Sequence, residues 1–93
     1  MKIFKYHLRE LTNPVELPFD AKPLSVGYDG ESKLSVWVLL DENEVDKRKF
    51  HFEVFGTGWN IEGETGEYLG TTLCQNSGLV WHVFFTKKTE HVR

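Results

Sequence analysis

The chain has 93 residues, a formal net charge of −3 and 40% hydrophobic residues, which is enough for a single domain, residues 1–93, with one modest core. The acidic balance argues against direct nucleic-acid binding, because such binding depends on Lys and Arg that meet phosphates. Because Cys74 is the single cysteine, an internal disulfide and a zinc site with paired cysteines are excluded, and a reducing cytoplasm is the expected setting. No apolar run approaches the ~18 residues of a membrane span.

The first elements are predicted to be extended. Residues 3–8 alternate apolar and charged side chains, which predicts a half-buried strand near a sheet edge, and the same pattern lacks the apolar core of a signal peptide. Three prolines in residues 12–23 exclude a regular helix there. We expect an extended crossing segment or short strand, with Leu17 and Phe19 against the core.

The middle of the chain predicts a hairpin. Residues 24–28 and 34–40 have strand character, and between them Asp29-Gly30 indicates a tight turn in which Gly30 takes the positive φ. Residues 41–49 are acidic and then basic, which predicts a solvated turn with local ion pairs.

The second half holds three further strands. They are expected at residues 50–55, 68–75 and 77–86, and the last of these is apolar on both faces, which is typical of a central strand. Residues 56–67 have no periodic pattern, and the charged tail, residues 86–93, is expected to fray.

These elements predict an all-β fold, a small antiparallel sandwich or barrel of about six strands with little or no helix. A second set of apolar residues lies on the strand faces opposite the expected core. Either the sheet folds over on itself, or a second copy or a partner covers this set, which makes Trp37 a candidate contact residue. The set consists of Trp37, Leu39, Phe55, Val80 and Phe84.

The turn Gly56-Thr57-Gly58 and the adjacent Trp59 are the main candidate binding residues, and Trp37 and His82 are further candidates. Successive N–H groups at glycines can hold an anion, but the turn has neither Walker nor Rossmann spacing, and a tight strand exit is the favoured explanation. Trp59 either contacts a partner, as aromatic residues on loops often do, or folds back to cap the open end of the sandwich.

Histidines and nucleophiles give a weaker signal. His51 and His82 could share a metal ion if their strands were neighbours, but no third ligand is evident, so we expect no metal site and no cofactor. Asp29, Asp41 and Glu53 could each pair with a histidine, and Ser77 or Cys74 could act as a nucleophile. No triad motif such as G-x-S-x-G is present, and we therefore do not expect an enzyme.

Three short motifs, in this order along the chain, carry a resemblance to a known family: Gly56-Thr57-Gly58, then Tyr68-Leu69-Gly70-Thr71, then Val80-Trp81-His82-Val83-Phe84. Together with Leu17-Pro18 and Leu24-Ser25-Val26 they resemble a family of small proteins of unknown function from tailed bacteriophages and prophages, over nearly the whole chain to about residue 85. Family members often have His where this chain has Trp59. The resemblance implies a phage product in the host cytoplasm and assigns no catalytic residue.

We therefore expect a phage-encoded binding protein that acts by non-catalytic occlusion of a host or phage protein, for example a host defence enzyme. One alternative is an oligomeric sponge for a small nucleotide, held at Gly56–Gly58 with Lys47–Lys49 as the counter-charge. Others are a virion or accessory structural protein and an acidic nucleic-acid mimic. The second apolar set also predicts self-association as a homo-oligomer.

Overall fold

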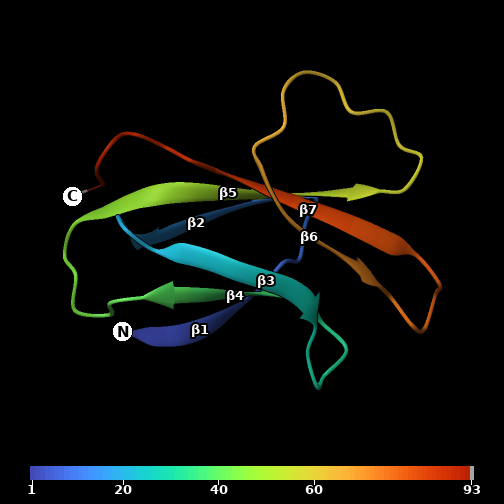
Figure 1. The fold of residues 1–93 in the computed structure, drawn as a ribbon, viewed down its shortest axis with the longest axis horizontal. Coiled ribbons are helices and arrows are strands. Elements are labelled where there is room, and N and C mark those ends of the chain that lie inside the picture. Colours follow the sequence, from blue (N-terminus) through green and yellow to red (C-terminus); the bar gives the residue numbers. More distant parts are fainter. Residues whose placement is uncertain (93) are drawn as a thin grey trace.

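The computed structural model describes residues 1–92, which form seven strands and no helix, and so no helix that could span a membrane (Figure 1). The strands are β1 (Lys2–His7), β2 (Thr12–Pro18), β3 (Lys22–Tyr28), β4 (Leu34–Leu40), β5 (Lys47–Gly56), β6 (Glu67–Leu73) and β7 (Val80–Lys87).

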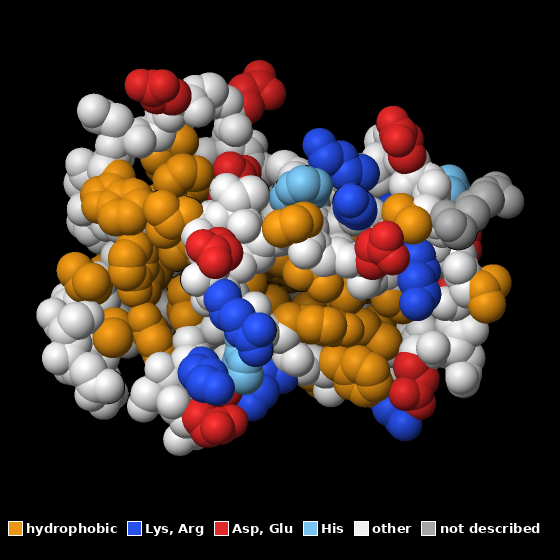
Figure 2. Space-filling model, turned by 180° about the vertical axis from the view of Figure 1, so that it is seen from behind, with side chains coloured by type: hydrophobic (Ala, Val, Ile, Leu, Met, Phe, Trp, Pro, Cys, Tyr) orange, Lys and Arg blue, Asp and Glu red, His pale blue; other side chains and the backbone are white. Residues whose placement is uncertain are grey.

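The strands build two antiparallel sheets, a three-stranded one with the order β1-β4-β3 and a four-stranded one with the order β2-β5-β7-β6. β3 and β6, from different sheets, lie against each other along one side. The expected all-β sandwich is confirmed, and β7 holds the interior position expected of it. Figure 2 looks onto the other side, where hydrophobic side chains are visible between the edge strands β1 and β2.

The core lies between the two sheets and follows strand alternation. In β5, Phe50, Phe52 and Val54 all point inward and are at most 4% exposed. Val36 and Val38 of β4 face them and are fully buried. Burying side chains of this size contributes roughly 1.5–3 kcal/mol each, so this apolar face is what holds the two sheets together.

The proline-rich segment is a full strand, β2, which makes seven strands where about six were expected. Pro14 and Pro18 are accommodated because β2 is an edge strand, where a missing N–H costs little. Asn13 anchors the entry to β2: its side-chain oxygen accepts hydrogen bonds of 3.0 Å from the backbone N–H groups of Arg9 and Glu10.

The basic residues 47–49 are the first residues of β5, and the prediction of a solvated turn with local ion pairs was wrong here. Pairing with β2 extends the strand, since Arg48 lies opposite the buried Leu17. The acid beside them, Asp46, pairs with His91.

The C-terminal tail is held, not frayed, as far as residue 92. β7 continues to Lys87, and the backbone N–H of Val92 then donates to the carbonyl of Lys47 at 2.7 Å. The ring of His91 stacks on that of Phe19, with centroids 4.1 Å apart. The tail was expected to fray because its residues are charged, and that pattern contains no information on these contacts with Lys47 and Phe19.

The β3–β4 hairpin forms as expected, but Gly30 does not take the positive φ. The turn is closed by hydrogen bonds from Ser32 N–H to Asp29 O and from Asp29 N–H to Lys33 O, both 3.0 Å. Ser32 adopts the left-handed conformation with φ 59°, because the turn is longer than the two-residue form that Asp-Gly predicts.

Candidate functional site

The predicted turn at Gly56–Gly58 forms where β5 ends. The N–H of Trp59 donates to the carbonyl of Gly56 at 3.2 Å, and Gly58 has φ 86°, a conformation that favours glycine. The N–H of Thr57 donates to the carbonyl of Val80 at 3.3 Å. The amides of Thr57 and Trp59 are therefore engaged within the protein, which leaves fewer N–H groups at this turn for an anion.

The distance along β5 also argues against a nucleotide held at Gly56–Gly58 with Lys47–Lys49 as its counter-charge. Lys47–Lys49 begin β5 and Gly56 ends it. An extended chain places Lys49 and Gly56 about 23 Å apart, so this basic cluster cannot supply the counter-charge to the glycine turn.

Trp59 was expected either to fold back on the sandwich or to be available to a partner. The structure shows part of both, because the side chain is folded back and still partly exposed. Its ring meets that of Trp81 edge-on, with centroids 5.6 Å apart and an interplanar angle of 84°. It also packs so closely on Gly56 that a Cβ there would lie 2.6 Å from the indole. Nevertheless 47% of Trp59 remains exposed, and the indole is thus a fixed apolar contact surface.

A shallow apolar hollow of about 320 Å³ lies beside this indole. Leu79, in the turn that leads into β7, lines it and is 53% exposed. We call this region, residues 56–59 with residues 78–81, the Trp59 surface. Sequence reasoning assigned Trp81 to the buried strand and missed its place here, because two glycine turns meet at this end only in the folded chain.

The Trp59 surface lies in an acidic part of the protein. Residues 50–86 contain no Lys or Arg and four glutamates. In Figure 2 hydrophobic side chains gather at the left end of the molecule, with acidic side chains above them. A partner that offers apolar groups inside a basic rim would complement this surface.

His82 adjoins the turn but is fully engaged. Its Nε2 lies 2.7 Å from Thr57 Oγ1 and its Nδ1 lies 2.9 Å from Thr71 Oγ1, which in turn lies 2.5 Å from the Tyr68 hydroxyl. This chain of contacts ties the glycine turn to β6 and β7. Because both ring nitrogens are in use, His82 acts here as a link between strands.

A metal pair of His51 and His82, considered above and not expected, is not formed. Their strands are neighbours, as that idea required, but His51 lies opposite Thr86 and His82 opposite Phe55. This offset of four residues displaces the two backbone positions by about 13 Å along the strands. Within residues 1–92 no cluster of three His, Cys, Asp or Glu side chains is placed to hold a metal ion.

Trp37 lies apart from the other candidates, on the outer face of the three-stranded sheet. It stands between Lys5 of β1 and Ser25 of β3. Its ring comes within 3.7 Å of where a Cβ on Gly27 would lie. The structure therefore brings Gly56, Thr57, Gly58, Trp59 and His82 together and leaves Trp37 outside the group.

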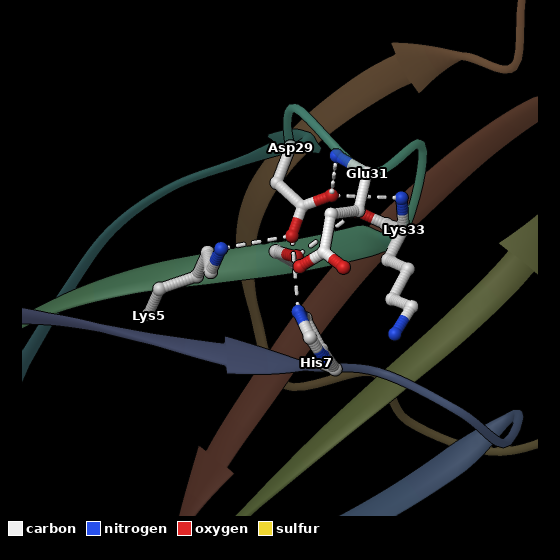
Figure 3. A network of polar contacts seen from close by, with 6 residues as sticks. Lys5, His7, Asp29, Glu31 and Lys33 are labelled. Atoms are coloured by element: carbon white, nitrogen blue, oxygen red, sulfur yellow. Dashed lines mark hydrogen bonds and ion pairs between the residues drawn. The ribbon is translucent and has the colours of Figure 1, made fainter.

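Asp29 is the centre of a second polar cluster (Figure 3). Its carboxylate accepts hydrogen bonds from Lys5 Nζ at 2.9 Å and, on the same oxygen, faces His7 Nε2 at 3.0 Å. The backbone N–H groups of Glu31 and Lys33 bind the other oxygen at 2.9 Å. Lys5 first, and then these amides and His7, hold the pKa of Asp29 well below its ordinary value.

Cys74 is the nucleophile candidate with the most altered chemistry. Hydrogen bonds from the Ser77 hydroxyl and backbone, with a smaller contribution from Tyr28, lower the pKa of the thiol to about 7. No histidine in the described part of the chain forms a hydrogen bond with Cys74. The lowered pKa favours the thiolate form, but none of the described histidines is hydrogen-bonded to it as a general base.

The comparison with known families gives one match. Residues 1–93 match the profile described as "Domain of unknown function (DUF7352)". No curated protein and no solved structure matches the chain. Since the match spans the full sequence, the chain belongs to the DUF7352 family of domains of unknown function.

Proposed function

We propose that this protein is a non-catalytic binding domain that occludes a protein partner with its Trp59 surface. The observation that carries the proposal is Trp59 itself, held against Trp81 and Gly56 yet 47% exposed beside an apolar hollow. An aromatic side chain that is already fixed in the free protein loses little conformational entropy on binding. Such residues often dominate the energy of protein interfaces.

The acidic residues around the Trp59 surface indicate what charge a partner should have. Residues 50–86 contain four glutamates and no Lys or Arg, so no basic Lys or Arg lies near the Trp59 surface in sequence. The partner we propose is a protein that presents an apolar side chain to the hollow from within a basic rim. Rim charges of this kind mainly accelerate association, whereas the apolar centre sets the lifetime of the complex.

The proposed setting is a bacterial cell that carries a tailed phage or prophage, and the partner is a host or phage protein such as a defence enzyme. This part rests on the resemblance of the Gly56–Gly58, Tyr68–Thr71 and Val80–Phe84 pieces to phage proteins. Occlusion, rather than catalysis, agrees with the engaged His82 and with a Cys74 thiol to which no described histidine is hydrogen-bonded.

The test begins with capture of partners by tagged protein in infected host cells, followed by reconstitution with the purified partner. We expect Trp59→Ala to weaken the reconstituted complex by about 2 kcal/mol or more, as hot-spot aromatics do. Val45→Ala is the matched control, because Val45 is an exposed apolar residue, 86% accessible, in the β4–β5 connection.

The outcomes separate the alternatives. Circular dichroism must first show that the Trp59→Ala protein is folded. Unchanged affinity in that variant would remove the Trp59 surface from the interface, and recovery of the protein in purified particles alone would indicate a virion component.

A further inference from the structure

Arg48 points into the sandwich. Strand alternation places it on the same face of β5 as Phe50 and Phe52, both fully buried. It is therefore a cation at the end of the core-facing row, where an apolar residue would be expected. Its neighbours Lys47 and Lys49 are on the opposite face and exposed.

The charge of Arg48 is not balanced within the described chain. Its Nε atom is buried without a hydrogen-bond partner, and no carboxylate in residues 1–92 forms an ion pair with it. The guanidinium carbon lies 3.9 Å from the ring centroid of Phe19 and 5.5 Å from that of Phe50. These rings hold the group in place, but an aromatic face does not replace a hydrogen-bond acceptor.

A cavity lies beside this side chain. It has a volume of about 470 Å³ and opens where β3, β5, β6 and β7 come together, a size typical of small-molecule sites. Three cations line it, Lys22, Arg48 and Lys87, against two carboxylates, Asp20 and Glu67. The rest of its wall is mainly apolar side chains from β3, β6 and β7.

We propose that this cavity binds a small organic oxyanion, a carboxylate or phosphate compound, with Arg48 as the principal ligand. A guanidinium presents pairs of N–H groups that match two oxygens of either anion. Burial of the Arg48 Nε atom from water strengthens its attraction for an anion, and the contacts with Phe19 and Phe50 fix the orientation of the guanidinium in advance. The site is independent of the Trp59 surface, since Arg48 and Gly56 lie toward opposite ends of β5.

The side-chain resonance of Arg48 gives a direct test. The sequence has only three arginines, Arg9, Arg48 and Arg93, so their Nε–Hε signals are readily assigned in the ¹⁵N-labelled full chain. The protein is titrated separately with inorganic phosphate and with benzoate, a carboxylate with an apolar body. We expect a saturable shift of the Arg48 signal with at least one of them, and the tighter binder identifies the class of ligand.

Two variants decide whether the effect is specific. Arg48→Gln should weaken binding at least about tenfold, whereas Lys49→Gln, which removes the same charge from the other face, should change it less than about twofold. If Arg48→Gln does not fold, Lys87→Gln replaces it and should weaken binding measurably. Shifts that stay linear with both anions, or an equal loss in Lys49→Gln, would overturn the proposal.

Discussion

Asp29 shows how one side chain can organise a turn and a neighbouring strand together. Its two oxygens receive Lys5 and His7 from β1 and two backbone N–H groups from its own turn, and the side chain is only 3% exposed. The Asp-Gly pair predicted the hairpin. The cation and imidazole that meet Asp29 come from more than 20 residues away, and only the pairing of β1 with β4 brings them there.

The lowered pKa of Asp29 predicts how stability depends on pH. The unfolded chain, in which Asp titrates near its ordinary pKa of about 4, binds more protons below that pH than the folded chain does. The contribution of Asp29 is therefore complete above about pH 4 and is lost as the pH falls toward the folded-state pKa.

We expect Asp29→Asn to lower the free energy of unfolding at pH 7 and to lose less stability than wild type between pH 7 and pH 3. Urea unfolding at both pH values measures this difference. Glu62→Gln, a carboxylate in the exposed loop before β6, serves as the control and should keep the wild-type dependence. Equal pH dependence in Asp29→Asn would contradict the assignment.

Ser32 carries backbone strain that glycine would relieve. A non-glycine residue in the left-handed region costs roughly 1–2 kcal/mol, partly offset in glycine by the larger entropy of its unfolded chain. Since Ser32 has φ 59°, Ser32→Gly should stabilise the protein by about 0.5–1 kcal/mol. Thermal unfolding tests this.

Gly30, two residues before Ser32 in the same turn, is a matched control for Ser32→Gly. It does not have a positive φ, and a Cβ there would meet nothing within 4 Å. Gly30→Ala should be neutral or stabilise by up to about 1 kcal/mol. A loss of stability in Ser32→Gly would place the strain elsewhere in the turn.

At the scale of the elements, β6 lies so close to β7 and β3 that two glycines, Gly66 and Gly70, leave little room for a side chain. Gly66, just before β6, packs against the main chain of β7, where an added Cβ would lie 2.1 Å from the carbonyl oxygen of Phe85. Within β6, a Cβ on Gly70 would lie 2.8 Å from a methyl group of Val26 on β3. The first contact is backbone and the second is the end of a side chain, so they should differ in tolerance.

We expect Gly66→Ala to destabilise the protein by about 3 kcal/mol or more, because the backbone of β7 cannot move away without breaking the ladder. Gly70→Ala should cost only about 1–2 kcal/mol, because Val26 can adjust. Urea denaturation of both variants measures the ranking. The reverse order would mean that β6 is held by the sheet interface rather than by its approach to β7.

At the scale of the whole molecule, most strand pairs are distant in sequence. β1 pairs with β4, and β2 pairs with β5 at the edge of the second sheet.

The two proposed binding sites lie toward opposite ends of this sandwich, so each can be altered without the other. Self-association stays a prediction, although Phe84 of the second apolar set is partly covered by Phe55 and Tyr68 of its own sheet.

This topology predicts slow folding for so small a chain. Non-local pairing must close long loops before any contact is gained, and β-sandwich domains accordingly fold in milliseconds to seconds. We expect the main refolding phase on that timescale in stopped-flow experiments that follow the three tryptophans. A submillisecond phase that carries the full amplitude would show that the native pairing is not rate-limiting.

The sequence alone determined the local features of this protein. Alternation of apolar side chains located most of the strands and excluded helices, and Leu17 lies in the core as expected. Glycine spacing marked the turn beside Trp59. These features could be predicted because side-chain alternation and turn conformation depend on neighbouring residues.

Only the tertiary structure decided which strands pair and what each charged residue meets. Charge suggested that Arg48 was solvated and that the tail was free, whereas pairing with β2 and β7 turned Arg48 inward and ordered the chain to Val92. The cluster at Asp29 likewise depends on β1 lying beside β4. Strand pairing is set by burial across the whole chain, and no local pattern contains that information.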